Sequence, residues 1–344
     1  MITIYSEAHA SHCDTYEVMN GELTPCFETP QRAFSIVKEL KFCGLSDIRL
    51  PDSHGISSYA SVHDEAYVRF LSDAWKQWSD AGRRGSALPL VWPVRGNVTA
   101  PPDSIDGRLG YYSMDTCAPI TAGTWEAVCA SADTALTGAG YLERGHRAAF
   151  ALCRPPGHHA SRDCMGGYCY LNNAALAAQK LIDGGAHRIA ILDVDYHHGN
   201  GTQHIFYDRA DVLFVSLHAD TRVSYPYFSG RKEEVGNGIG YGFNKNYPLP
   251  HGVSWGVYGD VLANACSEIE RYAPDALVVS LGVDTHEDDP IGRFRLQEGN
   301  YLRMGEIIGR LDIPTLLVME GGYLIEKMAS NVVSVVASFD GVKA

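Results

Sequence analysis

Short apolar runs that end in polar residues recur along this 344-residue chain, and they are the feature that most constrains its fold. Six of these runs have the length and composition of buried strands, at residues 2–5, 148–152, 188–192, 212–217, 276–281 and 315–319. Segments with helical apolar spacing lie between them, including 173–183 and 255–272, and Gly184 and Gly185 end the first of these. Strands that alternate with helices predict an α/β fold, with a mostly parallel sheet and helices on both faces.

The composition excludes several classes of protein. With 45% hydrophobic and 20% charged residues, the chain is neither disordered nor a coiled coil. The formal net charge of -13 disfavours a nucleic-acid partner, and no apolar run approaches the roughly 18 to 20 residues that span a membrane. Nine scattered cysteines without a CxxC pair, and an N-terminus without a signal-peptide pattern, predict a reducing, cytoplasmic location.

Residues 82–119 differ from the rest of the chain because they are rich in Gly, Pro and Arg and show little periodicity. They predict a long loop excursion from the core, and such loops are usually functional or disordered. A glycine-rich stretch at residues 236–242 is followed by FNKNYPL rather than by a helix, which disfavours a phosphate-binding loop. The length of the chain allows one large α/β domain or two smaller ones.

Polar residues gather directly after five of the predicted strands. They occupy residues 154–159, 193–201, 218–220, 282–290 and 320–323. In open α/β sheets the ligand crevice lies beyond the carboxyl ends of the strands. We therefore expect these five segments to converge on one site.

The segment DVDYHH predicts a metal site. Side chains alternate along a strand, so Asp193, Asp195 and His197 should point to one side. Neighbouring carboxylates are costly without a compensating cation, although a capped strand end with internally paired polar groups is an alternative. Asp284 would complete three N/O ligands and leave one position open, as in catalytic Zn(II) or Fe(II) sites.

Two further features suit acid–base chemistry. His158 and His159 are adjacent, so they cannot bind one metal as an i, i+4 pair, but a turn after Pro-Pro-Gly can present both rings to one cavity for proton transfer. Tyr323 follows two glycines and could donate to an oxyanion. The structural alternatives are a packed histidine pair and a packed tyrosine.

Taken together, RPPGHH, GGYCYLNNAA, DVDYHHGNGTQ, VSLH, SLGVDT and MEGGY resemble the zinc-dependent deacetylases of the arginase/deacetylase fold. The resemblance extends from about Tyr5 to Tyr323, and GELTPCFETP and DGRLGYYS are most similar to bacterial acetylpolyamine amidohydrolases. It implies a single deacetylase domain at residues 1–344, with a central sheet of about eight strands and the excursion at the active-site mouth.

The resemblance also implies a function. The protein would be a homodimer that removes acetyl groups from small cationic N-acetylated amines, such as acetylputrescine or acetylcadaverine, and releases acetate. A deacetylase of acetyl-lysine in proteins is the alternative enzyme. A metal-binding sensor without turnover would lack a ligand, the histidine pair or the tyrosine, and an arginase-like ureohydrolase would need a second set of metal ligands.

The implied roles can be given residue by residue. The catalytic set is His158, His159 and Tyr323. The metal ligands are Asp195, His197 and Asp284, for zinc or alternatively ferrous iron. Asp193 would support His158, and Asn200 stands where many deacetylases have an aspartate behind His159. That asparagine should leave the His159 ring less biased toward imidazolium and favour it as a base.

Substrate and potassium contacts are implied as well. The tunnel residues are Tyr168 and Tyr225, and the acidic residues expected to meet the distal ammonium are Asp106 and Glu17, the latter reaching a partner's active site. Structural potassium is implied near Asp193, Asp195, His197 and Ser216. Cys117 stands at a second acidic position of such relatives, which puts long polyamines in doubt. His286 could shape the tunnel mouth, compete for metal or be exposed.

Overall fold

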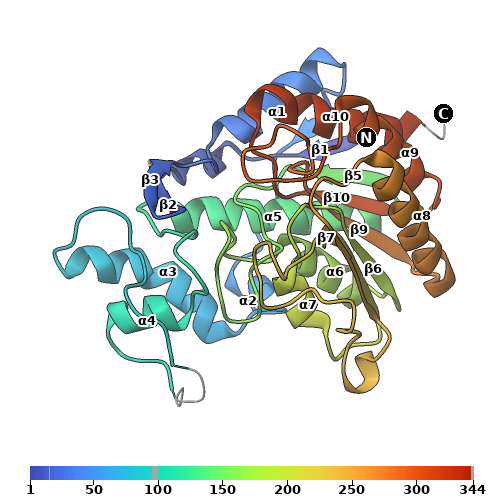
Figure 1. Ribbon diagram of the computed structural model, residues 1–344. Helices are drawn as coiled ribbons and strands as arrows, with labels where there is room; N and C mark the ends of the chain where they lie inside the picture. The colour runs from blue at the N-terminus through green and yellow to red at the C-terminus, as the bar shows by residue number, and fades with distance from the viewer. Residues whose placement is uncertain (15, 95–99, 342–344) are drawn as a thin grey trace.

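In this computed structural model of the protein, residues 1–14, 16–94 and 100–341 are described. Eight of the described strands form one sheet in the order β4-β1-β5-β10-β9-β6-β7-β8, and every neighbouring pair is parallel (Figure 1). The strands are β1 (Ile2–Ile4), β4 (Ile48–Arg49), β5 (Ala148–Ala151), β6 (Ile189–Asp193), β7 (Val212–Ala219), β8 (Asn244–Leu249), β9 (Ala276–Leu281) and β10 (Thr315–Met319). The predicted α/β class and parallel sheet are confirmed.

Helices cover both faces of this sheet, as predicted. One face carries α2 (Ile56–Tyr59), α3 (Glu65–Asp80), α4 (Ile105–Tyr111), α5 (Thr124–Glu143), α6 (Asn173–Asp183) and α7 (Asn200–Phe206). The other carries α1 (Gln31–Phe42), α8 (Trp255–Tyr272), α9 (Glu298–Gly309) and α10 (Ile325–Gly341). In the described parts of the chain, no helix is long and apolar enough to cross a membrane.

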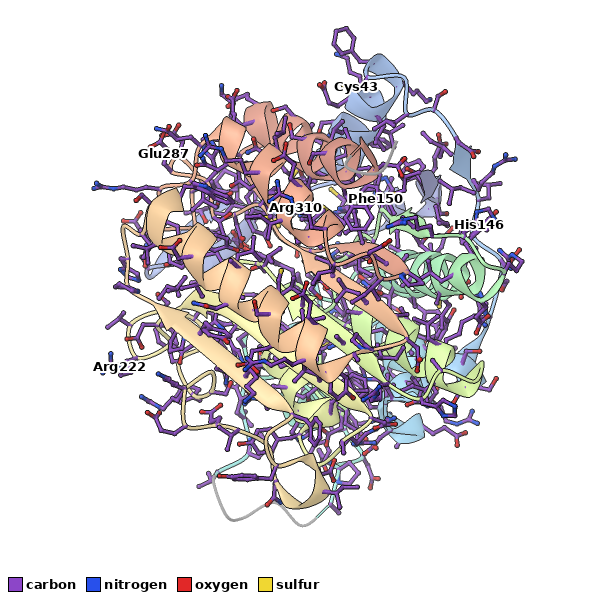
Figure 2. The ribbon with its side chains drawn as sticks, turned by 90° about the vertical axis from the view of Figure 1, so that its right-hand side faces the viewer. Cys43, His146, Phe150, Arg222, Glu287 and Arg310 are labelled. Carbon is purple, nitrogen blue, oxygen red and sulfur yellow. The ribbon has the colours of Figure 1, made fainter. Side chains whose placement is uncertain are left out.

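Alternate side chains of each strand enter opposite cores, which explains why the strands are apolar throughout. In β9, Val278 packs under the α5–α6 layer, whereas Val279 packs under the α8–α10 layer. Phe150 of β5 is fully buried in the second core, and Arg222 and Glu287 project at the surface (Figure 2). Each such buried side chain stabilises the fold by roughly 1.5–3 kcal/mol.

A small hairpin lies outside the main sheet, formed by β2 (Tyr16–Met19) and β3 (Glu22–Pro25). Its two-residue turn places Asn20 and Gly21 at φ 53° and 83°. Asn-Gly favours this turn because asparagine and glycine tolerate positive φ more readily than other residues. Two short 3₁₀ helices, η1 (Glu7–Ser11) and η2 (Gly238–Gly240), complete the described elements.

The excursion at residues 82–119 is not entirely loop. It contains α4, whose first turn is capped by the Ser104 hydroxyl, which accepts a hydrogen bond from the Asp106 backbone amide at 3.4 Å. Ala87 pairs with Ile120 in an antiparallel bridge, so the two ends of the excursion are held together. Residues 95–99 of the predicted excursion lie outside the described residues.

His63 bridges the loop at Ser161 and the start of α6, and it should make stability depend on pH. Its Nδ1 donates to the Ser161 carbonyl at 2.8 Å, and its Nε2 accepts from the Asn172 amide at 2.9 Å, just before α6. Only the neutral ring can make both bonds, and burial lowers the pKa of His63 to about 4. The unfolded chain therefore binds more protons between pH 6.5 and 4, so stability is complete above that window and falls as pH decreases through it.

We expect wild-type protein to lose about 2 kcal/mol of unfolding free energy from His63 alone between pH 7 and pH 5. His63→Gln removes this proton uptake. The unfolding free energies measured by urea denaturation at pH 7 and pH 5 should therefore differ by about 2 kcal/mol less than in the wild type. His204→Gln, at an exposed position of α7, is the control and should keep the wild-type difference. An unchanged difference in His63→Gln would contradict this role for His63.

Candidate active site

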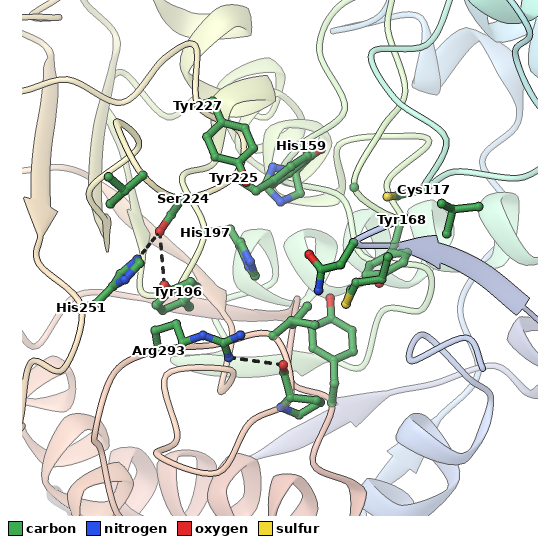
Figure 3. Close-up of a pocket in the computed structure, with 18 residues that line it drawn as sticks. Cys117, His159, Tyr168, Tyr196, His197, Ser224, Tyr225, Tyr227, His251 and Arg293 are labelled. Carbon is green, nitrogen blue, oxygen red and sulfur yellow. Dashed lines mark hydrogen bonds between the residues drawn. The ribbon is translucent and has the colours of Figure 1, made fainter. Parts of the chain in front are cut away.

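Segments that follow β5, β6, β9 and β10 meet at the carboxyl edge of the sheet, as predicted. A cavity of about 380 Å³ opens there (Figure 3). Its lining includes His159, Tyr168, His197, Tyr225 and Tyr323. The predicted polar segment 218–220, at the end of β7, behaves differently, because His218 is buried against the Gly230 carbonyl and Asp220 pairs with Arg222. Four residues of the loop after β7 reach the cavity instead: Val223, Ser224, Tyr225 and Tyr227.

Asp195, His197 and Asp284 form a compact group of potential metal ligands. One ligand atom from each lies within 4.8 Å of the others. His197 Nδ1 is 2.9 Å from Asp284 Oδ2 and 3.3 Å from Asp195 Oδ1, and all three side chains are buried. Buried carboxylates and an imidazole at these separations suit a divalent cation, which would compensate the two negative charges.

Gly321 preserves the space beside these carboxylates. A Cβ at this position would lie 2.6 Å from Asp195 Oδ2 and 2.8 Å from Asp284 Oδ2. The Gly321 amide donates to Asp195 Oδ2 at 2.8 Å, which orients that carboxylate. The loop after β10 therefore shapes the ligand group directly.

The two carboxylates of the group carry unequal proton affinities. Burial and the neighbouring Asp195 raise the pKa of Asp284 to about 7. Burial also acts to raise the pKa of Asp195, but the positive charges of His158 and His197 outweigh it and hold that pKa well below its usual value. A positive charge placed between Asp195 and Asp284 would therefore stabilise their ionised forms.

His158 and His159 lie side by side, with ring centroids 4.0 Å apart, but have different partners. His158 Nδ1 is 3.0 Å from Asp193 Oδ2, and although burial acts to lower the pKa of His158, Asp195 and Asp193 raise it to about 10. His159 Nδ1 is 2.7 Å from the Asn200 amide oxygen. Because an amide oxygen only accepts, His159 Nδ1 carries the hydrogen and Nε2 is left as an acceptor.

The pKa of His159 lies well below its usual value. Burial is the main cause, and positive charge on His158 and His197 adds to it. His159 is therefore neutral at physiological pH, while His158 beside it is held protonated. Asn200 contributes no negative charge that would reverse this order.

Tyr323 is held over the cavity by its own loop. Its backbone amide donates to Asp289 Oδ2 at 2.8 Å, and Arg32 Nε donates to the Gly322 carbonyl at 2.7 Å. The Arg32 guanidinium also lies 4.8 Å from the centre of the Tyr323 ring. Burial raises the pKa of the Tyr323 phenol well above its usual value, so the hydroxyl remains a hydrogen-bond donor.

A buried ion cluster behind this loop was not predicted. Glu28 accepts from Arg32 Nη1 at 2.8 Å and pairs with Arg154 Nη2 at 2.9 Å, and all three side chains are at most 2% exposed. Glu320 was also missed; its Oε2 accepts from the Gly157 and His158 amides at 2.7 and 3.1 Å. The i, i+4 spacing of Glu28 and Arg32 was the available signal, but their contact with the Tyr323 loop was not visible in the sequence.

The predicted tunnel residues Tyr168 and Tyr225 both line the cavity, and each binds an acidic residue. Tyr168 donates to Glu17 Oε2 at 2.8 Å, so Glu17 lies beside the cavity of its own chain. Tyr225 donates to Asp115 Oδ2 at 2.6 Å, a partner that the sequence did not reveal. Cys117 lines the cavity near Tyr168 (Figure 3).

Two predicted placements are corrected by the structure. Asp106 does not line the cavity, because it lies on α4 and forms an ion pair with Arg83. His286 is not exposed, since it is buried with its ring 6.4 Å from the Tyr301 ring and nearly parallel to it. Among the described residues, His286 belongs to no group of potential metal ligands.

The family resemblance implies potassium near Asp193, Asp195, His197 and Ser216. Asp193 of β6 is paired in register with Ser216 of β7, and both side chains are buried. The Ser216 hydroxyl is 2.8 Å from His218 Nδ1. Asp193 and Ser216 therefore lie side by side on neighbouring strands, and Asp193 is two residues before the metal-ligand candidate Asp195.

A ligand group of this kind, at the carboxyl edge of a parallel sheet, defines an α/β protein with a candidate divalent-metal site. The chain belongs to the histone deacetylase domain family, whose profile matches residues 26–339. It is 55% identical over 342 residues to acetylpolyamine amidohydrolase 2 of Pseudomonas aeruginosa, covering 99% of both chains. It is 46% identical over 341 residues to the acetylpolyamine amidohydrolase of Mycoplana ramosa, covering 99% of this chain and 100% of the relative.

A solved structure supports the same relationship. The crystal structure of an acetylpolyamine aminohydrolase from Burkholderia pseudomallei matches with a TM-score of 0.94 and 38% sequence identity. The match covers 99% of each chain. The family resemblance inferred from the motifs is thus confirmed along the whole chain.

The Gly321 contacts predict a specific effect on metal affinity. Gly321→Ala places a methyl group against Asp195 and Asp284, so we expect the affinity for Zn²⁺ to fall by about tenfold or more. Competition with a chromophoric chelator measures this affinity directly. Gly256→Ala is the matched control, since a Cβ there meets nothing within 4 Å. Equal Zn²⁺ affinity in the two variants would show that Gly321 does not shape the ligand group.

Proposed function

We propose that the protein is a zinc-dependent amidohydrolase that removes acetyl groups from small N-acetylated amines. The observation that carries this proposal is the placement of His159 and Tyr323 on one cavity with His197, which belongs to a buried group of potential metal ligands. The relatives named acetylpolyamine amidohydrolases, which match over nearly the whole chain, support acetylputrescine, acetylcadaverine or related acetylpolyamines as substrates.

Asp195, His197 and Asp284 would hold the metal, with ferrous iron as the alternative to zinc. A bound divalent cation supplies Lewis acidity for an acyl oxygen and lowers the pKa of a coordinated water. Structural potassium is proposed beneath the same group, supported by the buried oxygen atoms of Asp193 and Ser216.

The remaining steps fall to side chains of this chain. His159 Nε2, kept free by the Asn200 contact at Nδ1, accepts the proton of the attacking water. The Tyr323 hydroxyl donates to the acetyl oxygen as negative charge develops on it. His159 then returns the proton to the leaving nitrogen while the C–N bond breaks, and charged His158 offsets the buried carboxylates. The products are acetate and a free amine.

The cavity walls support a cationic substrate. Tyr168 and Tyr225 would flank the aliphatic arm, and the Tyr168 hydroxyl donates to Glu17, which is outside the cavity lining. Glu17 Oε1 is buried without a hydrogen-bond partner among the residues described, so an acceptor atom is left over on the Tyr168 side of the cavity. A protein acetyl-lysine deacetylase is the less favoured candidate, because the relatives matching the full length are named for acetylpolyamines.

A homodimer in a reducing compartment, the cytoplasm, completes the proposal. The hairpin beside the cavity exposes Tyr16, Val18 and Leu23 by 55%, 57% and 68%, which suits an interface. All nine cysteines are free, as expected for a reducing compartment.

Light scattering tests the dimer. It should give twice the chain mass of 37.6 kDa, and the mass of a single chain would contradict the dimer.

Tyr323→Phe tests the catalytic assignment. Removing only the hydroxyl should lower kcat for acetylputrescine by roughly 10²- to 10³-fold, as loss of other oxyanion donors does. The bound zinc and the melting temperature should be retained. Tyr241→Phe is the control, because Tyr241 is 71% exposed and does not line the cavity. A loss of less than about threefold would remove Tyr323 from the mechanism.

A further inference from the structure

The catalytic cavity has one positively charged wall that the proposed function does not use. Arg293 lines the same cavity as His159, His197 and Tyr323 (Figure 3). It follows β9 in the loop that contains Pro290, and its side chain is exposed. An arginine at this place is unexpected in a site for purely cationic substrates, because it repels them.

The Arg293 guanidinium has no compensating carboxylate. Its Nη1 donates to the Gly292 and Pro290 carbonyls at 2.8 and 3.4 Å. Within the described part of the chain, no carboxylate oxygen lies within 4.0 Å of it, and its Nε and Nη2 make no hydrogen bond. The positive charge of Arg293 and its Nε and Nη2 hydrogen-bond donors are therefore available to a ligand.

Other polar groups share this wall. His251 Nε2 is 2.6 Å from the Ser224 hydroxyl, which is 3.3 Å from the Tyr196 hydroxyl, and all three residues line the cavity. In Figure 3 they lie with Arg293 on one side of His197, whereas Tyr168 and Cys117 lie on the other. Glu17 does not itself line the cavity but accepts a hydrogen bond from Tyr168, so the cavity has a basic wall at Arg293 and an opposite wall that is backed by an acidic residue.

A molecule with both charges at its distal end fits these two walls. Guanidinium groups bind carboxylates through two parallel hydrogen bonds, a geometry that an ammonium cannot use. An ammonium near Arg293 is repelled, whereas one near Glu17 is attracted. The complement is an acetylated amine whose far end carries an ammonium and a carboxylate on the same carbon.

We propose that Arg293 is a specificity-determining residue that binds a substrate carboxylate, and that free ω-N-acetylated diamino acids, such as Nε-acetyllysine, are substrates. This inference rests on the proposed amidohydrolase function. Water adds to the acetyl carbonyl, the C–N bond breaks and the nitrogen receives a proton, so Nε-acetyllysine and water give acetate and lysine.

Two compounds isolate the carboxylate. Acetylcadaverine and Nε-acetyllysine differ only by the α-carboxylate, so the ratio of their kcat/KM values measures its contribution. For the zinc-loaded protein, we expect Arg293→Gln to lower the acetyllysine-to-acetylcadaverine ratio at least fivefold, about 1 kcal/mol. Arg295→Gln is the control, because Arg295 lies two residues away and does not line the catalytic cavity.

Binding gives a second readout that does not depend on turnover. Calorimetric titration of Nε-acetyllysine into the slow Tyr323→Phe protein should show a Kd at least fivefold weaker when Arg293→Gln is added. An unchanged ratio and an unchanged Kd in Arg293→Gln would overturn the inference. Hydrolysis of acetylcadaverine without any hydrolysis of Nε-acetyllysine by the wild type would overturn it as well, and would leave the amidohydrolase proposal standing. If neither compound is hydrolysed, both the substrate inference and the amidohydrolase proposal are contradicted.

Discussion

Negative charge buried at the carboxyl edge of the sheet is the constraint on which the rest of the site depends. Asp193, Asp195, Asp284 and Glu320 all have no exposed surface, and they lie at the ends of three neighbouring strands. Carboxylates in such a place need positive charge or hydrogen-bond donors nearby. A divalent cation would meet this need for the ligand group, whereas His158 meets it for Asp193 and backbone amides meet it for Glu320. The same edge therefore suits a metal ion and also orients the residues around the ligand group.

The two adjacent histidines show how neighbouring residues acquire different states from their partners. His158 faces Asp193 and is held protonated, whereas His159 faces the uncharged amide of Asn200 and is neutral. The charge on His158 itself disfavours a second charge on His159. Arg32, from a distant helix, ties the Tyr323 loop to the same edge, so packing of α1 sets the position of the phenol.

The sequence predicted the parts of this structure that local pattern determines. The central strands were visible because both faces of each are buried, which requires continuous apolar runs. The edge strands β4 and β8 were not predicted from the sequence, because β4 has only two residues and β8 contains Asn, Lys and Pro. The grouping of Asp195 with His197 was predicted because side chains alternate along a strand. Asp284 was added because its strand ends at the same edge of the sheet. The pairing of Asp106 with Arg83 and the contact of Arg32 with the Tyr323 loop depend on tertiary packing between distant segments, which no local pattern encodes.

The measurement that tests the central claim most directly is a comparison of kcat/KM for acetylcadaverine and for an acetyl-lysine peptide, using the zinc-reconstituted protein. A metal-dependent amidohydrolase for small acetylated amines should prefer acetylcadaverine by about tenfold or more, a difference of about 1.4 kcal/mol. Equal or greater efficiency on the peptide would make this chain a protein deacetylase and would contradict the proposed substrate class.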